Sequence, residues 1–348
     1  PTPVSTYLHS ATMVKAGVYL VARLAPAFAG TAGWRPLVLT TGVVTMVFGG
    51  LRALRQVDLK LLLAYGTVSQ LGFLVVLFGI GTPEATTAGC VMLLAHGLFK
   101  GALFMVVGIL DHQTGTRDIR KLPVLGEGWR TTKAVAAVSL LSMAGVVPLL
   151  GFVAKEAAYD ATLHADFWAS GVVLAGIVAG SVLTFAYSAR FWWGAFAAPR
   201  AVVLADGAAP PRPPAAAFVA PPVVLAAASL VLGLAPGLLD DVIDAAASSL
   251  DRATEAVHLA LWHSVNTALV LSAVTIAAGV ALFLVRRRVG RVIALGARIP
   301  SGDDGYRLLL RGLNRSANLV TGVVQNGSLP VYSGVILLTA AASPVAAL

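Results

Sequence analysis

Long hydrophobic runs, separated by short polar segments, follow one another along most of the chain. A helix that crosses a lipid bilayer needs roughly 20 mostly apolar residues. We count nine such runs and predict about nine transmembrane spans. They cover residues 4–28, 37–54, 61–80, 86–110, 133–163, 167–196, 216–235, 258–285 and 329–348. The predicted fold class is an all-α polytopic membrane protein.

The fifth run is too long for one straight crossing. Pro148 lies inside it, and proline removes a main-chain donor and clashes with the preceding helical turn. We predict a break at about residues 147–151, with Pro148 and Gly151 as the break residues. Irregular backbone at membrane depth occurs where protein covers it or where it lines a cavity, and transporter ion sites use such breaks. Lys155 and Glu156 follow the break directly.

The segment between the eighth and ninth runs is mixed in polarity. YRLLLRGLNR, residues 306–315, places leucines on one side of a helix and arginines on another. This pattern predicts an amphipathic helix along the membrane surface. We therefore predict three parts: a transmembrane bundle (1–285), a cytoplasmic-side basic loop with the amphipathic helix (286–328), and a further transmembrane helix (329–348).

The connecting loops alternate in charge. Loops after the even-numbered runs are basic, whereas loops after the third, fifth and seventh runs are poor in basic residues or acidic. The basic loop residues are Arg52, Arg55, Lys60, Arg117, Arg120, Lys121, Arg130, Lys133, Arg190, Arg200, Arg212, Arg286, Arg287, Arg288, Arg291 and Arg298. Because cytoplasmic loops carry the excess of Lys and Arg, we expect the even-numbered loops to face the cytoplasm.

Composition agrees with a protein embedded in a lipid bilayer. Charged residues make up 12% of the 348, against about 25% in soluble domains, and hydrophobic residues make up 57%. Mean hydropathy is +0.83. Most basic residues behind the net charge of +9 fall in particular connecting loops and not along one face, which argues against a nucleic-acid partner. Cys90 is the single cysteine, so the sequence predicts neither a disulfide framework nor a cysteine metal motif.

His96 and Lys100 lie near the centre of the fourth run. They are four residues apart, so a helix places them on one face. A charge at the bilayer centre costs roughly 2.5–3.5 kcal/mol on the insertion scale, and such residues normally face the bundle interior or a cavity. We therefore favour a functional role for this pair, and for Lys155 beside the predicted helix break.

Five other ionisable residues have both a functional and a structural interpretation. For His9 we favour the structural interpretation, a neutral histidine that is hydrogen-bonded to the backbone. Lys15 is explained equally well by an ion pair that holds helices together. Lys60 lies near a loop, where its side chain can reach the interface. Asp58 lies near a helix start, and Glu156 can neutralise Lys155.

The chemistry of these residues favours a proton relay. A His/Lys pair is a poor metal cage, because lysine must lose its proton to bind. No Ser/His/Asp constellation and no phosphate-binding glycine loop is present, so we predict no catalytic residues, metal or cofactor. Buried lysines and histidines can gain and lose protons near neutral pH.

Several long segments resemble a known family. PTPVSTYLHSATMVKAGVYLVAR and VDLKLLLAYGTVSQLGF resemble segments shared by the large proton-translocating subunits of respiratory complex I and of Mrp-type Na⁺/H⁺ antiporters. The motif TMVKAG, which contains Lys15, is similar to the large A-type subunit on the Mrp side, as are AHGLFKGALFMVVGILDHQTGTRDIRKL, GFVAKE and LWHSVN. The similarity is weakest in residues 201–216 and after Arg288.

This resemblance implies an antiporter-like bundle of inverted repeats, each with a broken helix. It implies that Lys60, His96, Lys100 and Lys155 lie on a central polar axis that carries protons. The amphipathic helix would match the lateral helix of these subunits. The first repeat, with its broken helix, would precede Pro1, and a further C-terminal part would follow Leu348.

The implied function is that of one component of a multisubunit antiporter that exports Na⁺, Li⁺ or K⁺ in exchange for H⁺. The partners would be small hydrophobic subunits in the plasma membrane of a bacterium. One alternative is a proton-pumping membrane subunit of an NADH-quinone oxidoreductase or a related hydrogenase complex, which would make the chain part of an enzyme. Another is a structural membrane scaffold without a path of its own.

The loop charges generate a prediction about topology. Cysteines introduced at Thr116 and Ser248 should react with an impermeant thiol reagent from opposite sides of the membrane, because their loops differ in charge. The parent protein is the control, since its single cysteine lies inside an apolar run. Labelling of both positions from one side would contradict the predicted arrangement of spans.

Overall fold

The computed structural model describes residues 2–10, 12–197, 211–254, 258–261, 266–286, 288, 302–325 and 327–343. Contacts divide the chain into two units, Pro1–Arg286 and Arg287–Leu348, each of which is described by itself. Within the described residues the secondary structure is helical, apart from an isolated bridge between Asp58 and Asp118. The predicted all-α fold is confirmed.

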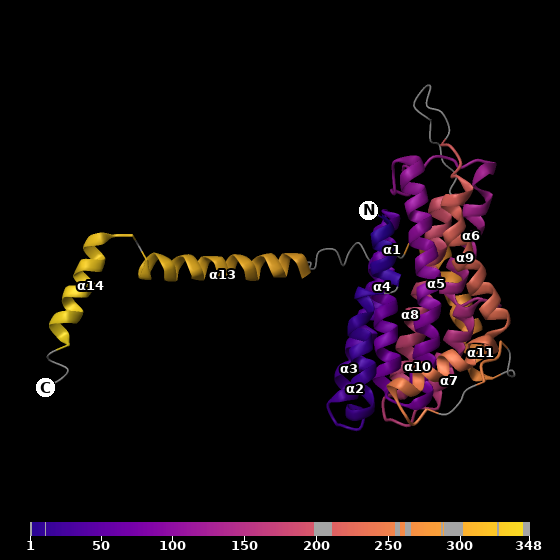
Figure 1. Cartoon of the computed structure of the whole chain (residues 1–348), viewed down its shortest axis with the longest axis horizontal. Helices are drawn as coiled ribbons and strands as arrows, with labels where there is room; N and C mark the ends of the chain where they lie inside the picture. Colours follow the sequence, from indigo (N-terminus) through magenta and orange to yellow (C-terminus); the bar gives the residue numbers. More distant parts are fainter. Residues whose placement is uncertain are drawn as a thin grey trace. The chain divides into compact units, whose positions relative to one another are not determined.

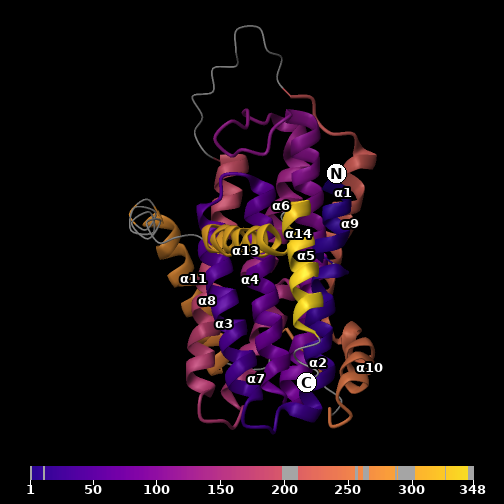
Figure 2. The same cartoon turned by 90° about the vertical axis from the view of Figure 1, so that its left-hand side faces the viewer.

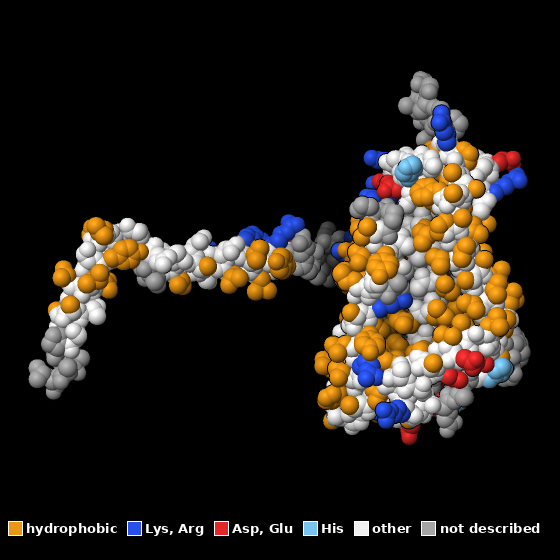
Figure 3. All heavy atoms as spheres, viewed as in Figure 1, with side chains coloured by type: hydrophobic (Ala, Val, Ile, Leu, Met, Phe, Trp, Pro, Cys, Tyr) orange, Lys and Arg blue, Asp and Glu red, His pale blue; other side chains and the backbone are white. Residues whose placement is uncertain are grey.

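The first unit is a bundle of long helices that lie side by side (Figures 1 and 2). Six helices of the described chain are long and apolar enough to cross a membrane. They are α3 (Trp34–Arg55), α4 (Leu59–Ile80), α5 (Pro83–Thr114), α8 (Ser170–Trp192) with the π-helical turn η3 (Trp193–Ala197), α9 (Ala216–Leu234) and α11 (Thr267–Leu284). Hydrophobic side chains cover the sides of the bundle, and most charged side chains gather towards its ends (Figure 3). The chain is a polytopic membrane protein.

The nine predicted spans are not confirmed as a number. The six long helices match the second, third, fourth, sixth, seventh and eighth runs. The first and fifth runs are each divided into shorter helices, and the described part of the ninth run forms a helix of only 14 residues. The first unit also contains three short helical elements. They are η2 (Glu127–Trp129), η4 (Pro236–Leu239) and α10 (Asp240–Leu250).

Small residues allow α3 and α4 to pack backbone against backbone. An added Cβ at Gly72 would lie 2.5 Å from the main-chain nitrogen of Met46, and one at Gly49 would lie 2.6 Å from that of Ser69. The Ser69 hydroxyl donates to the Met46 carbonyl at 2.7 Å. Close contact through small residues is a common way for membrane helices to associate. This contact fixes which face of α4 points into the bundle.

The first predicted span is interrupted, which the sequence analysis did not predict. It consists of α1 (Thr2–Ser10), the 3₁₀ turn η1 (Met13–Lys15) and α2 (Ala16–Phe28). Thr12 leaves helical geometry with φ −119° and ψ −93°, and its hydroxyl donates to the Tyr7 carbonyl at 3.2 Å. Hydroxyl groups that bind nearby main chain compete with helical hydrogen bonds. The interruption therefore needs no glycine or proline between Ser10 and Ala16.

The predicted break in the fifth run is confirmed. The run forms α6 (Arg130–Ala144) and α7 (Leu150–Leu163). Gly145 ends α6 with φ +82°, in the left-handed region that favours glycine. Its amide donates to the carbonyls of Leu141 and Ser142, the usual pattern of a glycine cap at a helix C-terminus. Pro148 lies between the two helices, and Gly151 lies in the first turn of α7.

The second unit contains α13 (Gly302–Val324) and α14 (Leu329–Ala342). The amphipathic segment predicted at residues 306–315 is helical and lies inside α13. Basic side chains follow one edge of α13, and hydrophobic side chains lie on the opposite edge (Figure 3). That this helix lies along a membrane surface stays a prediction, as does the division of the chain at residues 285 and 328.

Some predicted features lie outside the described residues. They are Arg200, Arg287, Arg291 and Arg298 of the basic loops, residues 262–265 of the LWHSVN motif, and residues 344–348 of the ninth run.

Gly151 permits the close approach of α7 to the end of α6. An added Cβ at Gly151 would collide with the Ser142 carbonyl, and the Gly151 amide donates to the Ser142 hydroxyl at 3.2 Å. We expect Gly151→Ala to destabilise the protein by about 1–3 kcal/mol, as overpacking does. The measurement is the thermal midpoint of the protein in detergent. Gly171→Ala is the matched control, because nothing lies within 4 Å of its added Cβ; equal midpoints would contradict the close approach.

Candidate functional site

Three lysines inside the bundle donate to a main-chain carbonyl of another element. The pairs are Lys15 of η1 with Leu93 of α5 at 3.0 Å, Lys100 of α5 with Leu63 of α4 at 3.2 Å, and Lys155 of α7 with Ala144 of α6 at 2.9 Å. Lys100 is 0% exposed and Lys155 is 3% exposed. A carbonyl accepts a hydrogen bond from an ammonium group and from a neutral amine alike. Each contact can therefore persist when the lysine gains or loses a proton.

Lys155 binds the end of the broken helix. Ala144 is the last residue of α6, and carbonyls at a helix C-terminus lack an internal partner and carry the negative end of the helix dipole. An added Cβ at Gly145 would lie 2.6 Å from Cδ of Lys155, so the lysine stem packs directly on the glycine that ends α6. Glu156, the next residue, is also buried, at 6% exposure. The break thus supplies the acceptor for Lys155.

His96 is enclosed between charged groups. It is 0% exposed, and neither ring nitrogen has a hydrogen-bond partner in the part of the chain that the structure describes. Its ring meets that of Phe99 edge to face, with centroids 5.5 Å apart. Lys15, Lys100 and His9 all act on His96 electrostatically. The structure therefore brings together residues from η1, α1 and α5.

His9 lies at the edge of the same group. Its ring stacks on Phe104 of α5, with centroids 5.1 Å apart. Lys60 and Lys100 act on it electrostatically. Lys60 is half-buried in the first turn of α4. His9 and Lys60 thus extend the group from the bundle interior towards the start of α4.

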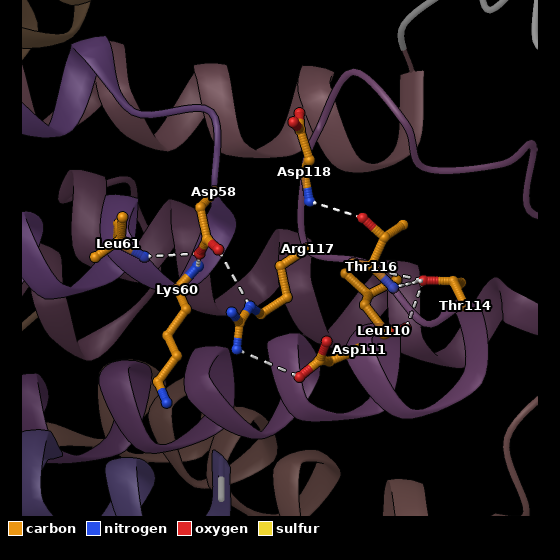
Figure 4. Close-up of polar contacts among 9 residues, drawn as sticks. All are labelled: Asp58, Lys60, Leu61, Leu110, Asp111, Thr114, Thr116, Arg117 and Asp118. Atoms are coloured by element: carbon orange, nitrogen blue, oxygen red, sulfur yellow. Dashed lines mark hydrogen bonds and ion pairs between the residues drawn. The ribbon is translucent and has the colours of Figure 1, made fainter.

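Asp58 caps α4 and ties it to the segment after α5 (Figure 4). Its Oδ1 accepts hydrogen bonds from the main-chain nitrogens of Lys60 and Leu61 at 2.7 and 3.0 Å, as a helix N-cap does. Its Oδ2 lies 3.2 Å from Nε of Arg117, which also pairs with Asp111 at 3.5 Å. The Lys60 side chain points away from this ion-pair cluster (Figure 4). These contacts support the structural interpretation of Asp58.

The segment after α5 carries a second charged pair. Side-chain and main-chain hydrogen bonds from Arg120 lower the pKa of Asp118 to about 2. The Asp118 amide in turn donates to the Thr116 hydroxyl at 3.2 Å (Figure 4). Asp118 therefore stays ionised at any pH near neutrality, and the turn keeps its shape.

Sequence reasoning missed a further polar group in the bundle. Gln70 of α4 donates from Nε2 to Oγ1 of Thr184 at 3.2 Å and to Oη of Tyr187 at 3.4 Å, both on α8. All three residues are at most 1% exposed. The amine of Lys100 lies over the Tyr187 ring, 6.0 Å from its centroid. Polar residues inside two apolar runs were the only signal available, because the partners are more than a hundred positions apart.

The described residues contain no group of three or more His, Cys, Asp or Glu side chains that could hold a metal ion. Amines, imidazoles, hydroxyls and one amide make up the polar interior around Lys100. Such groups bind and release protons or orient groups that do.

The fold and this interior define a class: a multi-pass helical membrane protein with interrupted helices and buried lysines. The chain also matches the family model described as "NADH:quinone oxidoreductase/Mrp antiporter, TM" over residues 1–184. It belongs to this family.

Two relatives are subunits of bacterial Na⁺/H⁺ antiporters. The chain is 36% identical to the A-type subunit of the Na⁺/H⁺ antiporter of Alkalihalophilus pseudofirmus, covering 95% of this chain and 44% of that protein. It is 34% identical to the A1-type subunit of the Na⁺/H⁺ antiporter of Staphylococcus aureus strain JH9, covering 97% and 45%. The chain thus spans less than half the length of these relatives.

Chains of three membrane complexes of known structure are similar in fold to this chain. A chain of the Mrp complex from Dietzia sp. DQ12-45-1b is 38% identical with a TM-score of 0.87, covering 100% of this chain and 38% of that one. A chain of an archaeal membrane-bound sulfane sulfur reductase is 26% identical with a TM-score of 0.62, covering 72% and 50%. A chain of respiratory complex I from Thermus thermophilus, at 24% identity and a TM-score of 0.58 over 68% and 49%, shares the fold.

The contacts of Asp58 generate a prediction that separates its two interpretations. Asp58→Asn keeps an N-cap acceptor but loses the charge facing Arg117, whereas Asp58→Ala loses both. We expect the alanine variant to be the less stable, with the cap accounting for about 0.5–2 kcal/mol. Thermal midpoints in detergent measure this order. Equal midpoints of Asp58→Ala and the parent protein would contradict the structural interpretation.

Proposed function

We propose that this chain is the proton-carrying part of the large A-type subunit of a multisubunit Na⁺/H⁺ antiporter. Lys60, His96, Lys100 and Lys155 are the relay residues of this proposal, and His9, Lys15 and Glu156 lie beside them. Protons move through the membrane along these groups and drive the export of Na⁺, Li⁺ or K⁺. The names of the two relatives, both of them subunits of Na⁺/H⁺ antiporters, support Na⁺ and H⁺ as transported ions.

The burial and hydrogen bonding of Lys100 carry the proposal. Its amine is fully enclosed in the bundle and donates to the Leu63 carbonyl. Withdrawal from water disfavours a charged amine in general, and a neutral carbonyl offers only part of the compensation that a carboxylate would give. A lysine in this setting exchanges its proton at a smaller free-energy cost than one fixed in an ion pair. This is the property that a relay station needs.

The neighbouring histidine provides a second station. His96 lies one helical turn before Lys100, and its ring nitrogens have no partner among the described residues. A neutral imidazole accepts a proton at one nitrogen and releases one from the other. Lys15 and Lys100 both act on this ring. His96 therefore connects the interrupted first span to the Lys100 side of the bundle.

The break between α6 and α7 supports Lys155 as the next station. Lys155 is held at the Ala144 carbonyl, and discontinuous helices commonly form ion sites in transporters. One proton that crosses a membrane potential of 100 mV releases about 2.3 kcal/mol of free energy. This free energy is the driving force that the proposal assigns to cation export.

The proposed surroundings follow from the family. The partners are other small hydrophobic subunits of the same complex, as the similar chain in an Mrp complex supports. The location is the plasma membrane of a bacterium. The segment of residues 286–328 lies on its cytoplasmic side, with α13 along the membrane surface.

A second candidate function has its own support. The family model covers subunits of NADH:quinone oxidoreductases as well as Mrp antiporters. A redox-driven pump would acidify everted vesicles when NADH is added and would not depend on Na⁺. An antiporter dissipates a pH gradient when the cation is added without NADH. A scaffold subunit would show neither activity in an assembled complex.

The test uses Lys100 in the assembled complex in everted vesicles. Arginine keeps its charge at any accessible pH, since its pKa exceeds about 12. We therefore expect Lys100→Arg to abolish Na⁺-induced dissipation of a pH gradient as fully as Lys100→Ala does. A lysine that only provides positive charge predicts substantial rescue by arginine instead. Assembly is checked on native gels.

Lys133 provides the matched control. It also donates to a main-chain carbonyl, that of Leu125 at 3.0 Å, but it lies in the first turn of α6. The Lys133→Arg variant should show wild-type Na⁺-induced dissipation of the pH gradient. Retention of most of the activity in Lys100→Arg would show that the relay role of Lys100 is wrong.

A further inference from the structure

The polar contact between α4 and α8 is not used by the proposed function as stated. Gln70, Thr184 and Tyr187 are buried in the bundle and form a connected group, here called the α4–α8 bridge. A buried amide and two hydroxyls inside apolar helices are costly unless they are hydrogen-bonded. Their position beside Lys100 gives them a further use.

The hydrogen bonds fix the orientation of the Gln70 amide. The Thr184 hydroxyl donates its own hydrogen to the Gly180 carbonyl at 2.8 Å, so towards Gln70 it can only accept. The side-chain nitrogen of Gln70 must therefore face Thr184, and the same nitrogen reaches the Tyr187 oxygen. Because the amide donates to this oxygen, the Tyr187 hydroxyl can direct its own hydrogen to another acceptor, and the Thr184 and Ser69 side chains also interact with this hydroxyl.

Tyr187 and Lys100 meet at Gly66. A Cβ added to Gly66 would lie 3.0 Å from Nζ of Lys100, 3.2 Å from Cε2 of Tyr187 and 3.3 Å from its Cζ. The amine and the phenol end of the ring therefore both border the same point beside Gly66. Gly66 and Gln70 are one turn apart on the same face of α4. Lys100, which packs on Gly66, therefore lies against the face that carries the amide orienting Tyr187.

The other side of the bridge leads towards α7. Ser181 lies one turn before Thr184 on α8 and is 0% exposed. Its hydroxyl acts on the Tyr159 hydroxyl of α7, although without normal hydrogen-bond geometry. Tyr159 also shares a hydrogen bond with Thr275 of α11 at 3.1 Å. Tyr159 lies four residues after Lys155, on the same face of α7.

We infer that the Tyr187 hydroxyl, oriented by Gln70, is a relay residue that passes protons between Lys100 and the Thr184 and Ser181 hydroxyls of α8, in the direction of Lys155. This inference rests on the proposed function and adds the connection between two of its lysines. In each transfer the phenol oxygen forms a bond to the arriving proton as its own O–H bond breaks towards the next acceptor. No tyrosinate remains, and the side chain ends with the same number of protons. Gln70 is a positioning residue, because it acts through Tyr187.

Tyr187→Phe is the test, since it removes the hydroxyl and keeps the ring beside Lys100. A positioned proton transfer contributes roughly 10²–10⁴-fold, and a water that partly replaces the hydroxyl leaves a loss of about tenfold or more. We expect the maximal rate of Na⁺-induced exchange in everted vesicles to fall by this factor. The apparent KM for Na⁺ should stay unchanged, and the solvent deuterium isotope effect should rise because proton transfer becomes rate-limiting. A packing defect alone would not raise the isotope effect.

Two further variants complete the design. Gln70→Met removes the amide at similar volume and should give a smaller loss of rate with the same rise in isotope effect. Ser188→Ala is the matched control, because Ser188 is a buried hydroxyl on α8 that donates only to the Thr184 carbonyl of its own helix at 2.7 Å. It should behave like the wild type.

The outcomes separate this inference from the proposed function. Wild-type rate and isotope effect in Tyr187→Phe, together with inactive Lys100→Ala, would overturn the inference and leave the lysine relay in place. Active Lys100→Ala would remove the proposed function itself. If Tyr187→Phe fails to assemble on native gels, Gln70→Met decides, and a wild-type isotope effect in that variant overturns the inference.

Discussion

The hydrogen bond from a buried lysine to a main-chain carbonyl is the constraint on which the rest of this structure depends. A membrane interior offers no water to solvate an ammonium group, and a helix already uses most of its carbonyls. Lys155 meets this requirement at Ala144, whose carbonyl is free because α6 ends there. Lys100 instead shares the Leu63 carbonyl with the Thr67 hydroxyl. The break between α6 and α7 therefore provides the carbonyl that Lys155 needs in order to be buried.

Glycines make these contacts possible, because a lysine reaches a carbonyl of another helix only where no side chain intervenes. Gly145 leaves room for the stem of Lys155, and Gly66 leaves room for the amine of Lys100. Gly151 brings α7 close enough to α6 for the first of these contacts. The buried lysines thus constrain residues on other helices that carry no polar group themselves.

Sequence patterns predicted the features that depend on local composition. Apolar runs located the long helices, and Pro148 marked the break in the fifth run. The interruption after Ser10 was missed, because it results from hydroxyl groups and a tertiary contact of Lys15 rather than from a helix-breaking residue. The contact of Gln70 with Tyr187 was also missed. It joins two apolar helices whose packing follows from the whole bundle, and no local pattern encodes it.

Asp58 and Arg117 differ from His96 and Gln70 in how far their polar atoms are hydrogen-bonded. At the start of α4, Asp58 and Arg117 use their polar atoms in hydrogen bonds and ion pairs, as a rigid clamp does. Inside the bundle, both nitrogens of His96 and the side-chain oxygen of Gln70 have no partner among the described residues. Each such atom costs about 1–3 kcal/mol when it stays unpaired. Under the proposed function His96 holds a proton in only part of a transport cycle and accepts this cost in the other part, whereas Asp58 and Arg117 keep their partners throughout.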